Sequence, residues 1–104
     1  MKPSPTHCPA ELTLRVIDGR WKIPILWRLA CETLRFSQLR RDLAGCSPKM
    51  LTRQLREMER DGLVCRKVYP QVPPKVEYSL TSRGKSLKPV VRAMCHWGTR
   101  RKLN

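Results

Sequence analysis

Residues 47–61 read Ser47-Pro-Lys-Met-Leu-Thr-Arg-Gln-Leu-Arg-Glu-Met-Glu-Arg-Asp61, and Gly62 follows them. This stretch carries the start and stop signals of a single helix. Ser47 is a preferred N-cap, and Pro48 suits the first helical position because its missing N–H has no partner there anyway. Gly62 can adopt the left-handed conformation that often follows a helix C-terminus. We therefore predict a helix between Ser47 and Gly62.

This helix has two chemically distinct faces. Each residue advances about 100° around a helix, so Leu51, Leu55 and Met58 form one apolar stripe. Four cations fall within about 60° of one another on the opposite side; they are Lys49, Arg53, Arg56 and Arg60. One face is expected to pack against the protein, and the other forms a cationic surface.

The order of charges in the helix is unfavourable for an isolated helix. The helix dipole favours acids in the first turn and bases in the last, yet Lys49 and Arg53 come early and Glu57 and Glu59 come late. An external polyanion at the N-terminal half would compensate for this arrangement, as in a helix that inserts its N-terminal residues into the DNA major groove. The alternative is an ordinary solvated face.

Composition favours a polyanionic partner. The chain has 104 residues, which suits one domain, and 22 Lys plus Arg against 8 Asp plus Glu give a net charge of +14. Only two histidines and no Gly-rich phosphate loop are present, so neither an enzyme nor a bound cofactor is expected. The sequence lacks an 18-residue apolar run and a signal-peptide core, which predicts a cytoplasmic protein without membrane binding.

The segments before this helix predict the first part of a helical domain. Residues 1–9 form a Pro-rich arm, expected to be non-helical and flexible, and residues 10–98 form the domain. Short helices are expected at 10–17 and 21–31, the second being the most apolar. Residues 33–36 are β-prone. Ser37 is then expected to cap a helix over 37–43 that exposes Arg40 and Arg41. With the turn at 44–46, this arrangement predicts a helix-turn-helix.

After Gly62 the apolar period changes from that of a helix to that of a strand. Two strands at 63–69 and 75–80, reversed by the Pro-rich loop 70–74, predict a β-hairpin. Thr81 is expected to cap a last helix that Pro89 kinks and Gly98 ends, with residues 99–104 as a basic tail. The predicted fold is mainly α with a small β-hairpin: a winged helix-turn-helix.

Several motifs resemble those of the HxlR-type winged helix-turn-helix regulators. The resemblance spans Cys8 to Gly98 and is carried by Ile17-x-Gly19-x-Trp21-Lys22, Leu34-Arg35-Phe36-Ser37-x-Leu39-Arg40, Ser47-x-Lys49-Met50-Leu51-Thr52-x-Gln54-Leu55-Arg56, Asp61-Gly62-Leu63-Val64 and Val76-Glu77-Tyr78-Ser79-Leu80-Thr81. It implies a bacterial transcriptional regulator that binds double-stranded operator DNA as a homodimer, through its first and last helices. The apolar content of those two helices independently favours a dimer over a monomer that buries them in its own core.

Geometry divides the predicted DNA-binding residues by role. Those near the N-terminus of the predicted reading helix are expected to meet base edges, with Arg53 the best candidate for a bidentate contact to guanine. They are Ser47, Lys49, Thr52 and Arg53. Others are better placed for phosphates or positioning; they are Ser37, Arg40, Arg41, Arg56 and Lys75, with Arg66 and Lys67 near the last.

The five cysteines show no disulfide framework, in agreement with a reducing compartment. In several redox- or electrophile-responsive relatives of the resembled family, the position of Cys8 holds the reactive thiol, which makes Cys8 a candidate sensor of an oxidant or small-molecule effector. Cys46, before the reading helix, could also be stabilised as thiolate. Cys31, Cys65 and Cys95 are expected in the core. No metal site is predicted, because the pairs His7-Cys8 and Cys95-His96 lack the usual ligand spacing.

The main alternative function is a sequence-tolerant nucleoid-associated or RNA-binding protein. A net charge of +14 predicts such a protein equally well. RNA recognition usually requires exposed aromatic residues, and the chain has few: one Phe, two Tyr and three Trp. Survival of binding in the presence of bulk competitor DNA separates the two functions.

Overall fold

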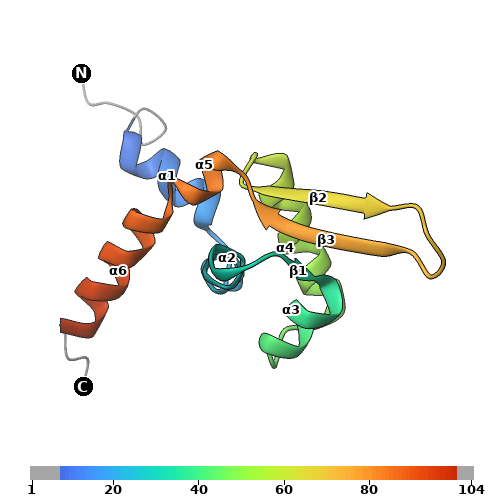
Figure 1. Ribbon diagram of the computed structural model, residues 1–104. Helices are drawn as coiled ribbons and strands as arrows, with labels where there is room; N and C mark the ends of the chain where they lie inside the picture. The colour runs from blue at the N-terminus through green and yellow to red at the C-terminus, as the bar shows by residue number, and fades with distance from the viewer. Residues whose placement is uncertain (1–7, 101–104) are drawn as a thin grey trace.

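The computed structural model describes residues 8–100 and has the expected winged helix-turn-helix fold. Its elements, in chain order, are α1 (Pro9–Ile17), α2 (Lys22–Cys31), β1 (Leu34–Arg35), α3 (Phe36–Asp42), α4 (Pro48–Arg60), β2 (Val64–Tyr69), β3 (Lys75–Leu80), α5 (Ser82–Lys85) and α6 (Lys88–Arg100). Figure 1 shows α2 near the centre, with the β2–β3 hairpin and α6 projecting to opposite sides of it. We call this hairpin the wing.

The limits of α4 follow from its capping residues, as predicted. The Ser47 hydroxyl accepts a hydrogen bond from the Met50 N–H at 3.1 Å, which satisfies one of the unpaired amides of the first turn. Pro48 occupies the first helical position. Gly62 has φ +77°, the left-handed conformation that a C′ glycine adopts readily, and it turns the chain from α4 toward β2.

One apolar core joins the helices to the sheet. The predicted stripe of α4 is completely buried, and Ile25 and Leu26 of α2 are buried against the same cluster. The largest side chains with almost no exposed surface are Ile25, Leu26, Leu39, Leu51, Leu55, Met58, Leu63 and Val91. Since residues of both α2 and α4 belong to this cluster, packing of α2 fixes the position of α4.

The hairpin belongs to a three-stranded antiparallel sheet with the order β1-β3-β2. The β-prone segment after α2 supplies the third strand, in which Leu34 pairs with Tyr78. In the wing, Val64 pairs with Leu80 and Tyr69 with Lys75. The sheet therefore ties the wing to the start of α3, and so to the helix-turn-helix.

Helices α1 and α3 begin one residue earlier than predicted, and α2 begins at Lys22, one residue later. Pro9 does not belong to a non-helical arm but is the first residue of α1, a position where its missing N–H costs nothing. Ser37 does not cap α3 but lies inside it. The cap is Arg35, whose backbone N–H donates to the Gln38 side chain at 2.8 Å, so the helix begins at Phe36. Residues 1–7 of the predicted arm lie outside the described residues.

The predicted last helix is in fact two helices. Thr81 caps α5 as expected, accepting a hydrogen bond from the Gly84 N–H at 3.0 Å, but α5 stops at Lys85. The chain then turns, and Pro89 lies in the first turn of α6 instead of kinking a continuous helix. Gly98 does not end α6, which extends to Arg100. Residues 101–104 of the predicted basic tail lie outside the described residues.

Between residues 8 and 100, none of the helices has both the length and the apolar content needed to cross a bilayer.

Candidate nucleic-acid interface

The helix-turn-helix consists of α3, a tight turn and α4. Gly45, with φ +97°, supplies the left-handed residue that the turn requires. On α4, the four cations opposite the buried stripe are all exposed, as the periodicity predicts; they are Lys49, Arg53, Arg56 and Arg60. Ser47 is exposed and Thr52 is partly buried beside them. The N-terminal half of α4 thus presents hydrogen-bond donors and positive charge to solvent.

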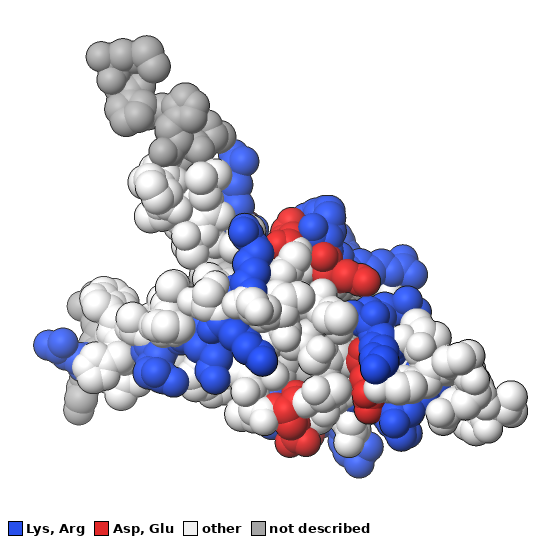
Figure 2. Space-filling view, turned by 45° about the horizontal axis from the view of Figure 1, so that its top comes forward, with Lys and Arg blue, Asp and Glu red and all other residues white. Residues whose placement is uncertain are grey.

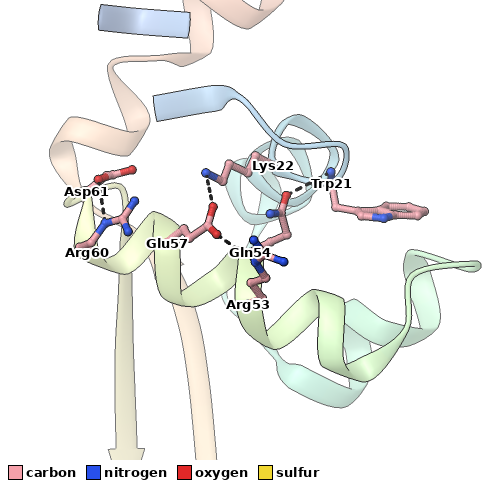
Figure 3. A network of polar contacts seen from close by, with 7 residues as sticks. All are labelled: Trp21, Lys22, Arg53, Gln54, Glu57, Arg60 and Asp61. Carbon is pink, nitrogen blue, oxygen red and sulfur yellow. Dashed lines mark hydrogen bonds and ion pairs between the residues drawn. The ribbon is translucent and has the colours of Figure 1, made fainter. Parts of the chain in front are cut away.

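Arg53, the predicted base-reading residue, has a partner in the structure. Its side chain is 72% exposed, and its Nε donates to Glu57 Oε2 at 3.4 Å, one turn further along α4. The other carboxylate oxygen of Glu57, Oε1, lies 2.7 Å from the ammonium of Lys22 on α2. Figure 3 shows both cationic side chains directed at this one carboxylate. The exposed guanidinium is therefore connected, through Glu57, to the core helix α2.

Glu57 is held in its charged form by these contacts. The hydrogen bond from Lys22 lowers the pKa of the Glu57 carboxyl below its usual range, with smaller lowering by Arg53, against the opposing effect of burial. Lys22 itself is only 3% exposed. A buried ammonium requires an anionic partner, and Glu57 is that partner.

Gln54 adds a second polar link between α2 and α4. Its side chain is buried, and its Oε1 accepts from the Trp21 backbone N–H at 3.4 Å. Sequence patterns alone do not single out Gln54, Glu57 and Lys22 as a cluster. The only available signals are the acid late in α4 and the Trp21-Lys22 motif, and neither shows which residues meet across the fold.

The residues predicted on α3 are exposed at the surface. Ser37, Arg40 and Arg41 are all solvent-accessible. At the end of this helix, Asp42 accepts from Arg28 of α2 at 2.6 Å, which anchors α3 to the core helix. Arg40 and Arg41 therefore extend from a fixed helix into solvent.

A groove of about 270 Å³ lies between α4 and the sheet. Arg56 of α4 and Arg66 of β2 both line it, together with the partly buried Thr52 and Phe36. Glu59 is also part of the lining. The groove brings a cation from α4 and a cation from the wing to one depression of the surface.

The strand ends next to the tip of the wing carry a compact polar cluster. Lys75 lies 3.4 Å from the Glu77 carboxylate, and both Lys67 and Lys75 lie over the Tyr69 ring, at 4.9 and 4.7 Å from its centroid. The Tyr69 hydroxyl donates to Glu77 at 2.9 Å and lowers the pKa of its carboxyl, with Lys75 adding to the effect. Figure 2 shows Lys and Arg side chains gathered directly beside the uncharged tip of the wing, at the right.

The cysteines are distributed differently from the prediction. The expectation that Cys31, Cys65 and Cys95 lie in the core is wrong, because all three are exposed, whereas Cys46 is buried. Burial raises the pKa of the Cys46 thiol, so the expectation of a thiolate favoured by the nearby helix N-terminus is also wrong. Cys8 is exposed at the N-cap of α1. In the part of the chain that is described, no three His, Cys, Asp or Glu side chains form a group suited to a metal ion.

Comparison with known proteins assigns this chain to a protein family. The family described as HxlR-like helix-turn-helix matches residues 16–103. The protein belongs to this HxlR-like family. The resemblance carried by the sequence motifs is thereby confirmed.

The relatives of this HxlR-like protein are transcriptional regulators. It is 49% identical over 96 residues to the uncharacterized HTH-type transcriptional regulator YybR of Bacillus subtilis, covering 92% of this chain and 77% of that protein. Among solved structures, the redox regulator HypR in its reduced form is 48% identical, with a TM-score of 0.85 and coverage of 89% and 92%. The reduced form of the transcriptional regulator YodB from B. subtilis is 34% identical, with a TM-score of 0.78 and coverage of 86% and 89%.

Proposed function

We propose that this protein regulates transcription by binding a palindromic operator in double-stranded DNA as a homodimer. Each subunit would place α4 in the major groove, with the two half-sites about 10 bp apart. The observation that carries this proposal is the surface of α4. Its apolar stripe is buried, and its four cations are exposed on the opposite side, beside the donors Ser47 and Thr52.

The site residues divide by their distance from the N-terminus of α4. Lys49, Thr52 and Arg53 would meet base edges, together with Ser47, whose hydroxyl still has a proton to donate while its oxygen caps the helix. Arg40 and Arg41 on α3 would bind phosphates, with Ser37 on the same helix. Arg56 would share a phosphate with Arg66 across the groove. Lys75, on the wing, would bind a phosphate near these contacts.

The homodimer is supported by apolar surface on the terminal helices. Val90, Met94 and Trp97 recur at helical spacing on one face of α6, and Trp97 is 65% exposed. Leu12 and Leu14 of α1 are about half exposed. The Cα radius of gyration is 15.5 Å, compared with about 13 Å expected for a compact chain of this size, because α6 and the wing both project from the domain. A second copy would cover these helices.

We also propose that Cys8 makes DNA binding responsive to oxidants or electrophiles. Its thiol is exposed at the N-cap of α1, where an oxidant or electrophile in solution can reach it. The similarity to HypR, described as a redox regulator, supports this role. The position of Cys8 on a helix of the proposed dimer surface would let a modified thiol change the relative orientation of the two subunits.

Selection of bound fragments from sheared genomic DNA tests the proposed function. The reduced protein is used at physiological salt with excess competitor DNA. Enrichment of a palindrome with half-sites about 10 bp apart is expected. If no sequence is enriched and binding is lost steeply as salt rises, the protein is instead the sequence-tolerant nucleoid-associated or RNA-binding alternative.

The sensing role is tested on the selected operator with the Cys8→Ser variant. Oxidant should weaken or strengthen binding by the wild type, and the variant should not respond. Cys65→Ser is the matched control, because Cys65 is also exposed but lies on the wing. A response that persists in Cys8→Ser and disappears in Cys65→Ser would reject Cys8 as the sensor.

A further inference from the structure

We propose that Glu57 is a specificity-determining positioning residue, which orients the Arg53 guanidinium for base recognition and is itself fixed by the buried Lys22. The proposal rests on the proposed function, because it requires that α4 reads a DNA sequence. Glu57 would not touch DNA. It would act through Arg53, and Lys22 would act through Glu57.

The two oxygens of the Glu57 carboxylate serve two different elements. Oε1 lies 2.7 Å from the Lys22 ammonium, and Oε2 accepts from Arg53 Nε at 3.4 Å. Lys22 is buried in the core helix α2, so the carboxylate is attached to a fixed point. In a simple exposed pair between residues four apart, both side chains would move freely and the geometry would be poorly defined.

The contact through Nε suits an arginine that must bind guanine. A bidentate contact to O6 and N7 uses two donors of the planar guanidinium, which carries five in a fixed fork. Holding Nε leaves the terminal Nη groups to meet the base. It also reduces the number of side-chain conformations that Arg53 must lose on binding, because long side chains carry large rotamer entropy.

A carboxylate at position 57 is unfavourable for DNA binding and for the helix, and a role in orienting Arg53 would explain its presence. A negative charge near the DNA-facing surface opposes phosphate attraction, and an acid late in a helix is unfavourable with the helix dipole. Lys22 could be replaced by an apolar residue of similar length if only packing mattered, since buried ion pairs contribute little to stability over such residues. The Lys22–Glu57–Arg53 contacts are therefore better explained by a role in sequence specificity than by a role in general affinity for DNA.

The first test compares Glu57→Gln with Glu59→Gln. The Glu57→Gln side chain keeps an oxygen that accepts from Lys22, but it faces Arg53 with a neutral amide. Glu59 is an exposed carboxylate on the same helix, so both variants lose one negative charge. Affinities are measured for the selected operator and for an operator with the Arg53-dependent base pair changed. Glu57→Gln should reduce the ratio of the two affinities about fivefold to tenfold. Glu59 lines the groove of the proposed phosphate contact, so Glu59→Gln should change both affinities by the same factor and leave their ratio unchanged.

A double-mutant cycle separates positioning from a general structural effect. In the Arg53→Ala background, Glu57→Gln should cause no further loss of discrimination, because there is no guanidinium left to orient. The paired change Lys22→Met with Glu57→Met removes the ion pair without stranding a charge, and it should stay folded and discriminate as poorly as Glu57→Gln. If Glu57→Gln discriminates like the wild type, or if its loss adds fully to that of Arg53→Ala, the inference is wrong.

The same measurements distinguish failure of the proposed function from failure of the proposed role of Glu57. A wild type that binds the selected operator no more tightly than bulk competitor DNA would overturn the proposed function. A wild type that discriminates between them, with Glu57→Gln indistinguishable from Glu59→Gln, would overturn only the role of Glu57.

Discussion

The ammonium of Lys22 lies 2.7 Å from Glu57 Oε1, so the core helix α2 is bonded to the middle of α4. Lys22 is nearly inaccessible to solvent, and Glu57 is its partner. The same region holds the hydrogen bond between the Trp21 N–H and Gln54. The N-terminal turn of α2 therefore fixes the rotation of α4, and so determines which side chains α4 presents to solvent.

This ion pair predicts a dependence of stability on pH. The contact with Lys22 lowers the pKa of Glu57 from its ordinary value of 4.5. A carboxyl whose pKa is lower in the folded state than in the unfolded state stabilises the fold above the unfolded value, and that contribution disappears as pH falls through the folded value. The urea midpoint of the wild type should therefore fall more steeply than that of Glu57→Gln between about pH 5 and pH 3.

Glu77 provides the control for that measurement. Its pKa is also lowered, by Tyr69 first and by Lys75. Glu77→Gln should remove the contribution of the wing and leave the contribution of Glu57 intact. Identical pH profiles for the wild type and Glu57→Gln would show that the Lys22–Glu57 pair does not stabilise the folded protein in solution.

Arg53 and Arg41 should respond differently to truncation. Arg53→Ala is expected to cost about 1–3 kcal/mol of binding free energy on the operator and to relax the sequence preference. Arg41→Ala should weaken binding to all sequences to a similar extent and reduce the slope of log affinity against log salt by about 1. Fluorescence anisotropy over a salt series measures both quantities. Equal effects of the two variants on specific and non-specific DNA would contradict this division.

The apolar face of α6 should control oligomeric state. Met94→Glu places a charge in the middle of the face that also carries Val90 and Trp97, and we expect it to shift the protein from dimer to monomer. Val72→Glu is the matched control, because Val72 is fully exposed at the tip of the wing. Sedimentation equilibrium gives the masses. A wild type that is monomeric at micromolar concentration would contradict the proposed dimer.

Two glycines should respond in opposite directions to alanine. A Cβ on Gly84 would clash with the carbonyl oxygen of Leu63, which is backbone and cannot yield easily, so Gly84→Ala should destabilise by about 1–3 kcal/mol. A Cβ on Gly98 would meet no atom within 4 Å, and Gly98 lies inside α6. Gly98→Ala should therefore stabilise the protein by about 0.5–1 kcal/mol. Thermal unfolding of both variants tests the pair, and a shift of the same sign in both would be inconsistent with this account.

Features determined by neighbouring residues could be predicted from the sequence. The limits of α4 follow from Ser47, Pro48 and Gly62, and its two faces follow from helical periodicity. The wing follows from two alternating segments around a Pro-rich loop. Each of these signals acts within a few residues, so the chain around it contains all the information needed.

Features that depend on contacts between distant segments could not be predicted. The break between α5 and α6 is one such case: the Leu63 carbonyl accepts from the Thr81 N–H and crowds Gly84, which fixes α5 against β2. The exposure of Cys65 and the burial of Cys46 depend on which face the fold covers. The meeting of Lys22 with Glu57 likewise requires α2 and α4 to be packed, and charge patterns within α4 alone do not reveal it.

Chemical-shift mapping on operator DNA tests most directly the central claim that the cationic face of α4 reads DNA. Isotope-labelled protein is titrated with the selected duplex, and backbone amide and arginine side-chain signals are followed. If α4 reads DNA, the largest changes should fall on residues 47–56, including the Arg53 Nε–H, with smaller changes in the wing. Large changes confined to α1 and α6, with α4 unaffected, would contradict it.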